Sequence, residues 1–234
     1  MSDAPICAVV GVGPGNGLAL ARRFAAGGHR VALLARRADA LAEFAGGIEG
    51  AVPVTCDVAD LQSVEGAFSA IREQLGPVTT LLYNAGSAVW GNIDALEAGD
   101  LDRGFAINAR GLFACAKQVL PDMREAGGGI IGIVGATASL RGKPATLGFA
   151  AAKAAQRSIA QSLARQLGPE NIHVYYAIID GMVDLRRTRE MLPDKGDEDF
   201  IRPDDIAEAM WQVGQQRRSA WSFEFDLRPF KESW

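Results

Sequence analysis

Long hydrophobic runs are absent from this chain, although 48% of its 234 residues are hydrophobic. No apolar run approaches the roughly 20 residues that a membrane-spanning helix needs, so we expect no membrane partner. Residues 1–5 carry no basic side chain, and the apolar run that follows them ends at Gly11. This beginning is unlike a signal peptide, and we therefore expect a cytoplasmic location.

Cysteine and histidine are scarce, and a basic excess is missing. The cysteines are odd in number and far apart, which predicts free, buried thiols in a reducing compartment: Cys7, Cys56 and Cys115. The two histidines, His29 and His173, are too remote from each other to suggest a metal site. The formal net charge of −4 argues against a nucleic-acid partner.

Linkers, internal repeats and low-complexity segments are also missing. At this length we expect a single dinucleotide-binding domain over residues 1–234. Residues 180–202 are polar and irregular in pattern, and we interpret them as a short substrate-loop region.

The chain contains short apolar runs that alternate with helical patterns. Strands are predicted at residues 6–10, 30–35, 51–56, 79–83, 130–134, 173–179 and 222–226. Helices are predicted at residues 17–26, 39–45, 60–75, from 100 or 102 to 126, 146–167 and 203–216. Strands with little polar alternation indicate an α/β fold, a Rossmann-like doubly wound domain. Its parallel seven-stranded sheet is flanked by helices on both faces.

A glycine-rich turn, Gly11-Val12-Gly13-Pro14-Gly15-Asn16-Gly17, joins the first strand to the first helix. This geometry offers backbone N–H groups and a helix N-terminus to a phosphate. The spacing is G-x-x-x-G-x-G, because Asn16 stands where G-x-G-x-x-G has its third glycine. Taken alone, the segment is also compatible with an ordinary strand-to-helix turn.

Ligands of such a sheet bind beyond the carboxyl ends of its strands. Arg36, Asp57, Asn84, residues 136–139 and Asp180 all follow strands and should cluster. Both histidines stand at the amino ends of strands, at the opposite edge of the sheet, which argues against a Ser–His–Asp hydrolase.

Arg36 follows the second strand, about twenty residues beyond the glycine turn, where the acidic residue of an NAD site bonds the ribose 2′-hydroxyl. An arginine at this point accommodates the 2′-phosphate of NADP, so the sequence favours NADP(H) over NAD(H). A solvated surface arginine is the alternative. Asp57 could accept a hydrogen bond from the adenine amino group or only cap the next turn.

The sequence resembles the short-chain dehydrogenase/reductases over nearly the whole chain. The motifs that carry this resemblance are the glycine turn, Asp57-Val58, Asn84-Ala85-Gly86 and Asn108. In that family the glycine turn binds the pyrophosphate, and the Asn-Ala-Gly turn lines the adenine–ribose side. The resemblance implies cofactor contacts at Gly11, Gly13, Gly15, Asn16, Gly17, Arg36, Asp57, Val58, Asn84, Ala85, Gly86, Lys153 and Val183.

The catalytic motif departs from the family pattern. The Tyr-x-x-x-Lys of the family reads Phe149-Ala-Ala-Ala-Lys153 here, and Ala136 stands at the serine position. The family's tyrosine moves a proton, its lysine lowers the pKa of that tyrosine, and its serine holds the reacting oxygen. Phe149 has no proton to transfer, and the Ala136 side chain has no hydrogen bond to donate.

Other groups could replace the missing acid. Lys153 could donate a proton if burial lowers its pKa, Thr137 or Ser139 could position the substrate, and Asp180 could act as a base. The candidate catalytic residues are Lys153, Asn108 and Ser139, and for Lys153 a ribose contact is favoured over direct catalysis.

Two functions fit these residues. The favoured one is an NADP(H)-dependent oxidoreductase that acts on a carbonyl or alcohol with an atypical active site. The other is a catalytically inactive NADP(H)-binding protein that serves as a sensor or assembly partner. The family pairs the two long helices, 100–126 and 146–167, across a subunit contact. We therefore expect a homodimer or homotetramer and a small-molecule substrate.

Overall fold

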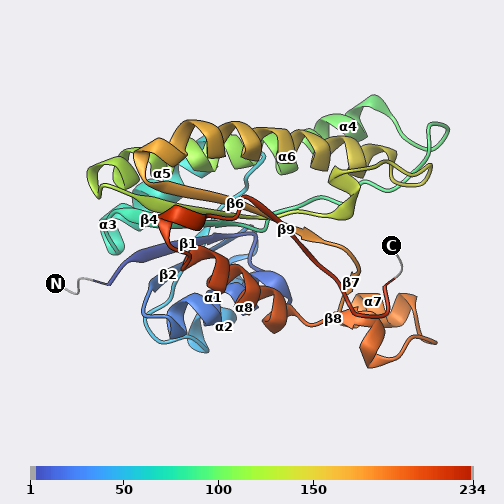
Figure 1. Cartoon of the computed structure of the whole chain (residues 1–234), viewed down its shortest axis with the longest axis horizontal. Helices are drawn as coiled ribbons and strands as arrows, with labels where there is room; N and C mark the ends of the chain where they lie inside the picture. The colour runs from blue at the N-terminus through green and yellow to red at the C-terminus, as the bar shows by residue number, and fades with distance from the viewer. Residues whose placement is uncertain (1–3, 233–234) are drawn as a thin grey trace.

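The computed structural model describes residues 4–232, and its centre is a parallel sheet of seven strands in the order β3-β2-β1-β4-β5-β6-β9 (Figure 1). The strands are β1 Ile6–Val10, β2 Arg30–Ala35, β3 Val52–Thr55, β4 Val78–Tyr83, β5 Gly129–Val134, β6 Ile172–Ile179 and β9 Glu224–Leu227. The order reverses at β1, which pairs with both β2 and β4. The predicted Rossmann-like α/β fold is confirmed.

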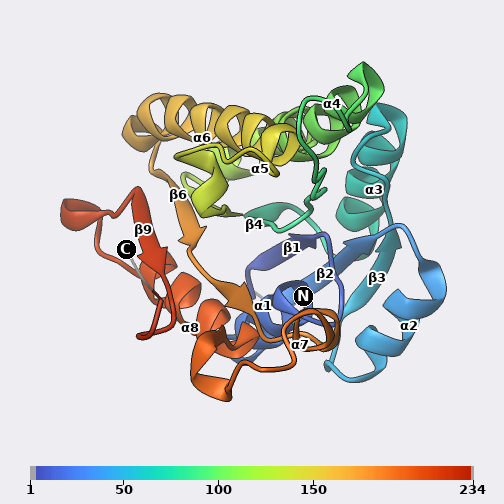
Figure 2. The same cartoon turned by 90° about the vertical axis from the view of Figure 1, so that its right-hand side faces the viewer.

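Helices cover both faces of the sheet, as Figures 1 and 2 show. One layer contains α1 Asn16–Ala26, α2 Ala38–Gly46 and α8 Pro203–Gly214, and the other contains α3 Leu61–Gln74, α4 Ala98–Phe105, α5 Gly111–Glu125 and α6 Leu147–Leu167. Each layer buries its own apolar cluster against the sheet. All eight residues of β6 are buried, which explains the continuous apolar run at this strand.

The predicted helix from 100 or 102 to 126 differs from the structure at its start and near its middle. It begins earlier, at Ala98, because the Asp100 carboxylate accepts a hydrogen bond from the Glu97 backbone N–H at 3.0 Å. A π-helical turn at Ala106–Arg110 then separates α4 from α5. Asn108 lies in this turn, so the irregular turn is built around a candidate site residue.

The polar stretch 180–202 is more regular than the sequence indicates. It contains β7 Met182–Val183, α7 Arg186–Met191 and β8 Phe200–Ile201, and β7 and β8 form a small parallel sheet of their own. The Thr188 hydroxyl accepts a hydrogen bond from the Leu185 N–H at 3.0 Å, which secures the start of α7. Elements of two to six residues are too short for hydrophobic periodicity to reveal.

Within residues 4–232, no helix is long and apolar enough to cross a bilayer.

Candidate functional site

The glycine turn closes tightly against the end of β4. Gly11 has φ +88°, and a Cβ built there would lie 2.4 Å from the Ala85 backbone nitrogen. The Asn84 side-chain amide donates a hydrogen bond to the Gly11 carbonyl at 2.8 Å. A side chain at Gly11 would be both strained and obstructed, so the sequence keeps glycine at this position.

A cavity of 1120 Å³ lies over this turn, at the carboxyl edge of the sheet. Its walls come from the glycine turn, the ends of β2, β3 and β4, the π-helical turn and the segment 184–190. The lining residues are Gly11, Val12, Gly13, Pro14, Gly15, Asn16, Gly17, Ala35, Arg36, Arg37, Cys56, Asp57, Val58, Asn84, Ala85, Gly86, Ile107, Asp184, Leu185, Arg186, Arg187 and Glu190. The structure therefore brings together the predicted cofactor residues from Gly11 to Gly86.

Residues of α7 and the segment before it, which belong to the region 180–202 interpreted as a substrate loop, form one wall of this cavity. A Cβ built on Gly15 would lie 2.4 Å from the Leu185 Cδ2 atom, so the Leu185 side chain packs directly on the glycine turn. Arg186 and Arg187 follow at the start of α7 and are exposed. The wall begins one residue after Val183, whose carbonyl accepts a hydrogen bond from the Thr188 hydroxyl.

Asp57 forms hydrogen bonds within the turn that follows β3. Its Oδ1 atom accepts a hydrogen bond from the Ala59 N–H at 3.0 Å, and its backbone N–H donates to the Ser63 hydroxyl at 3.0 Å. These two hydrogen bonds support the role of Asp57 as a cap of the next turn. The residue also lines the cavity. Burial raises the pKa of the neighbouring Cys56 thiol to about 11, so this cysteine carries no reactive thiolate near neutral pH.

Lys153 is buried, with 5% of its surface exposed. Its Nζ atom donates hydrogen bonds of 2.9 Å to the Val134 carbonyl and of 2.9 Å to the Gln156 Oε1 atom. Burial lowers the pKa of this amine to about 7. Lys153 can therefore exist in both protonation states near neutral pH, as a proton donor or acceptor requires.

The Lys153 amine lies beside Gly86, which lines the cavity, whereas Lys153 itself is not among the lining residues. A Cβ built on Gly86 would lie 3.8 Å from Lys153 Nζ and 3.4 Å from Asn108 Oδ1. The Asn108 amide donates to the Gly104 carbonyl at 2.9 Å and to the Ser87 carbonyl at 3.1 Å. Its Oδ1 atom is buried and has no hydrogen-bond partner among residues 4–232. The amine and this free acceptor thus both lie next to Gly86, a cavity-lining residue that has no side chain.

Phe149 and Ala136 offer no polar group to this region. The Phe149 ring instead contacts Trp90, with ring centroids 5.4 Å apart. Ser139 is buried and lines a different cavity, of 390 Å³, between the β5–α6 loop and α6. The structure therefore does not bring Ser139 to the wall of the larger cavity.

Thr137 and Asp180 are in direct contact. The Thr137 hydroxyl donates a hydrogen bond of 2.5 Å to Asp180 Oδ1, and Arg228 lies 3.2 Å from Asp180 Oδ2. The Asp180 carboxylate is therefore already engaged by a hydroxyl and a guanidinium and does not line the larger cavity. The cluster connects the ends of β5, β6 and β9.

Both histidines lie at the opposite edge of the sheet, as predicted. His29 packs edge-on against Phe24 and Trp211, and His173 stacks on Trp221 with ring centroids 4.6 Å apart. Over the described part of the chain, no group of three or more His, Cys, Asp or Glu side chains is arranged to hold a metal ion.

The sheet order, the glycine turn and the cavity at the carboxyl edge define a Rossmann-like doubly wound α/β protein. A family model described as short chain dehydrogenase matches residues 5–196. The chain belongs to the short-chain dehydrogenase/reductase family, which is a family of oxidoreductases.

Individual relatives agree with this assignment. The chain is 33% identical over 194 residues to a 2-(R)-hydroxypropyl-CoM dehydrogenase of Xanthobacter autotrophicus, covering 79% of this chain and 76% of the relative. A crystal structure of a short-chain dehydrogenase from Rhodopseudomonas palustris is 31% identical, with a TM-score of 0.82, over 97% of this chain and 99% of that one. An alcohol dehydrogenase from the archaeon Thermococcus sibiricus, complexed with 5-hydroxy-NADP, has a TM-score of 0.86 over 99% of both chains. At 23% identity, this last structure bears on the fold alone.

Proposed function

We propose that this protein is an NADP(H)-dependent oxidoreductase that acts on a carbonyl or alcohol. One observation carries the proposal: the cavity joins the glycine turn, Arg36 and the Asn84–Gly86 turn in one space, and the Lys153 amine lies next to Gly86. A nicotinamide dinucleotide, when bound, supplies or accepts the hydride. The residues of this chain bind and orient it and move the accompanying proton.

The preference for NADP(H) rests on charge. Arg36 and Arg37 follow β2, and Arg186 and Arg187 line the facing wall. A guanidinium stays charged at all relevant pH values and matches phosphate geometry. No acidic residue occupies the position after β2 where an NAD site places one. The arginines therefore favour the 2′-phosphate form.

Proton transfer is assigned to the Lys153 amine. Its pKa of about 7 suits a group that gives and takes a proton near neutral pH. Asp180 pairs with Arg228 outside the cavity lining, and Phe149 has no exchangeable proton. Asn108 Oδ1 is the free acceptor nearest Gly86 and is proposed to orient this amine or a water bound to it.

The absence of the usual tyrosine and serine favours a second candidate, an inactive NADP(H)-binding protein. Turnover separates the two. NADPH oxidation is measured with a panel of carbonyl compounds for the wild type, Lys153→Ala and the double variant Phe149→Tyr with Ala136→Ser. The proposal predicts wild-type turnover that Lys153→Ala reduces at least ~100-fold, the lower range for removing a general acid. A silent wild type, with activity gained only by the double variant, establishes the inactive protein instead.

A further inference from the structure

The side-chain amide of Gln156 lies in the core, next to the Lys153 amine. Gln156 is fully buried on α6, three residues after Lys153. Its Oε1 atom accepts a hydrogen bond of 2.9 Å from Lys153 Nζ and one of 3.3 Å from the Tyr176 hydroxyl. Because both neighbours are donors, the amide presents its oxygen to them and is fixed in one orientation.

The nitrogen of this amide has no such contact. Gln156 Nε2 is buried, and no acceptor among residues 4–232 bonds to it. An unpaired buried N–H group destabilises a fold, and an apolar side chain at this place would avoid that cost. The contact of the amide oxygen with Lys153 therefore points to a role in the chemistry of that amine.

Two fixed acceptors leave one position of the Lys153 amine free. The Val134 carbonyl and Gln156 Oε1 each accept a hydrogen bond of 2.9 Å from Nζ, and no third acceptor among residues 4–232 does so. A charged amine has three N–H groups, so one remains after these two bonds, and a neutral amine has its lone pair there. Gly86 lies beside the amine, with 3.8 Å between Nζ and a Cβ built on that glycine.

The hydrogen-bond partners of the Lys153 amine are uncharged, and the titratable groups on neighbouring elements are engaged elsewhere. Tyr176 on β6 stays protonated, because burial raises the pKa of its hydroxyl to about 12. Arg157 on α6 donates a hydrogen bond of 2.9 Å to Glu224 on β9. β5 and residues 137–139 carry no titratable side chain. The other titratable side chains on the elements packed against α6 are exposed or bonded to another group: Asp100, Asp102, Arg103, Arg110, Glu170, His173 and Tyr175.

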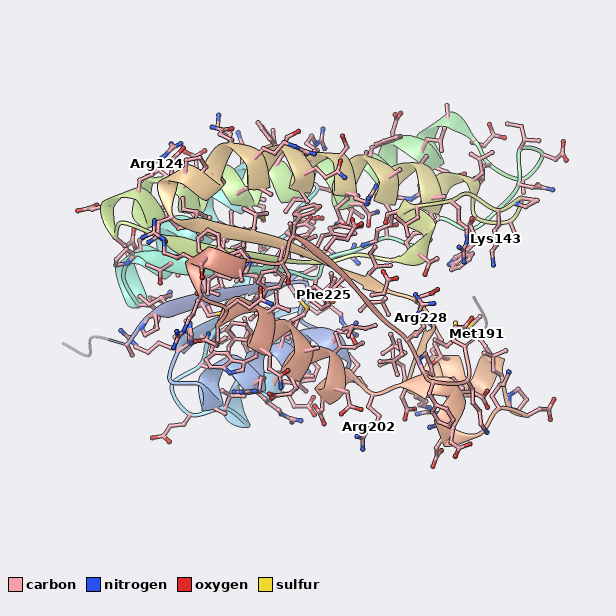
Figure 3. All side chains as sticks on the ribbon, in the orientation of Figure 1. Arg124, Lys143, Met191, Arg202, Phe225 and Arg228 are labelled. Atoms are coloured by element: carbon pink, nitrogen blue, oxygen red, sulfur yellow. The ribbon has the colours of Figure 1, made fainter. Side chains whose placement is uncertain are left out.

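Two exposed basic side chains mark the ends of the helix layer that contains α6. Figure 3 shows Arg124 and Lys143 at opposite ends of this layer. Arg124 on α5 pairs with Glu170 at 2.7 Å, and Lys143 lies on the loop before α6. The protonation of the Lys153 amine therefore depends on its burial and on its two uncharged acceptors.

We propose that Gln156 is a positioning residue that orients the Lys153 amine, so that the remaining position of the amine exchanges the reacting proton beside Gly86. This inference rests on the proposed oxidoreductase function. In carbonyl reduction the charged amine gives one proton to the carbonyl oxygen while the carbonyl carbon gains the hydride, and the amine then regains a proton from water. Gln156 also stabilises the charged amine, because a hydrogen bond to an ion is stronger than one to a neutral group.

Three variants test this role. Gln156→Met removes the acceptor with little change in volume, Gln156→Glu keeps an acceptor at the same place, and Gln166→Met at an exposed position of α6 is the control. Reduction is followed by NADPH oxidation from about pH 5 to pH 9, with the carbonyl compound that the wild type turns over fastest. Urea unfolding of the cofactor-free variants over the same range shows where stability begins to rise with pH.

The acceptor and the pH profile should change together. Gln156→Met should lower kcat roughly 10–100-fold, because the amine is no longer held in place, while KM changes less than about twofold. The pH above which turnover falls should move about one unit lower, and the onset of the rise in stability should move with it. Gln156→Glu should keep kcat within about threefold of the wild type and move both pH values about one unit higher, since a carboxylate favours the charged amine. Gln166→Met should match the wild type in each measurement.

The contrary outcomes are distinguishable. If Gln156→Met lowers stability equally at all pH values and leaves both pH values in place, Gln156 is only structural and the positioning role is wrong. The role is also wrong if Gln156→Met and Gln156→Glu move the pH profile in the same direction. If the wild type binds NADPH but reduces no carbonyl compound, the oxidoreductase function fails, and the unfolding profiles alone then decide whether Gln156 acts on the amine.

Discussion

Lys153 is held by neighbours that the sequence motif does not include. Gln156 and Tyr176 are fully buried, and the Tyr176 hydroxyl donates a hydrogen bond of 3.3 Å to the same Gln156 Oε1 atom that accepts from Lys153. Motif spacing identifies Lys153 but not these partners, because Gln156 lies on the core face of α6 and Tyr176 on β6, in an apolar run. Gln156 is a polar residue on the otherwise apolar core face of α6, and this feature of the sequence could have indicated a buried partner for Lys153.

The buried amine should make stability depend on pH. The pKa of Lys153 is about 7 in the folded chain, below its ordinary value of 10.5. Between these values the unfolded chain binds a proton that the folded chain lacks, so the contribution of this residue to stability rises with pH above about 7. Below pH 7 both states are protonated, and the full cost of a buried charge remains.

Replacing Lys153 with Met removes this dependence. We expect Lys153→Met to stabilise the fold relative to the wild type most at pH 6 and least at pH 9. The difference should shrink by about 2–3 kcal/mol over that range, since one pKa unit corresponds to about 1.4 kcal/mol. Urea unfolding at both pH values measures it, with Lys117→Met on the exposed side of α5 as control. A difference that is the same at both pH values would show that the amine is not buried as described.

At the scale of elements, some glycines of the glycine turn are required for folding and others leave space for a ligand. The sequence pattern does not tell these two kinds of glycine apart. Gly11 is needed by the fold, because of its positive φ and the 2.4 Å approach to Ala85. Gly13 has no atom within 4 Å of a built Cβ and faces the cavity. The pattern G-x-x-x-G-x-G predicts the turn, but only coordinates show which glycines serve folding.

Two alanine variants separate these requirements. Gly11→Ala should lower the free energy of unfolding by about 2 kcal/mol or more, from strain at positive φ and overlap with Ala85. Gly13→Ala should change stability by less than about 0.5 kcal/mol, and should weaken NADPH binding by placing a methyl group where the pyrophosphate is proposed to lie. Thermal unfolding and a binding titration of both variants provide the comparison. Equal destabilisation by the two substitutions contradicts this division.

Longer elements were easier to predict than short ones. The apolar runs predicted at residues 6–10 and 30–35 match β1 and β2 residue for residue. The helix predicted from residue 60 corresponds to α3, whose start Asp60 caps by accepting a 2.9 Å hydrogen bond from the Gln62 N–H. The π-helical turn at Asn108 and the short α7 have no such pattern. Their geometry depends on tertiary contacts, such as the bond from Asn108 to the Ser87 carbonyl.

For the whole molecule, the rule that ligands bind at the carboxyl edge grouped residues from three separate strand ends, whereas Ser139 and Asp180, which the same rule adds, do not line that cavity. Arg36, Asp57 and Asn84 line one cavity, as that rule predicts. Residues 180–202 were expected to be a substrate loop, but the packing of Leu185 on Gly15 was not predicted, because it depends on how the segment after β6 folds back across the sheet. The topology of the sheet can be inferred from the order of strands and helices in the sequence. The position of the cavity wall formed by residues 184–190 depends on side-chain packing, which the sequence pattern does not show.

The central claim is that this cavity binds NADP(H) through Arg36, and equilibrium binding tests it most directly. NADPH and NADH are titrated into the wild type and Arg36→Ala, with binding followed by tryptophan fluorescence. We expect the wild type to bind NADPH at least ~10-fold more tightly than NADH, and Arg36→Ala to lose that preference while its NADH affinity is unchanged, since a charge-assisted hydrogen bond contributes about 1.5–3 kcal/mol. Equal affinities of the wild type for the two cofactors would contradict the NADP(H) assignment, and no binding of either would contradict the proposed function.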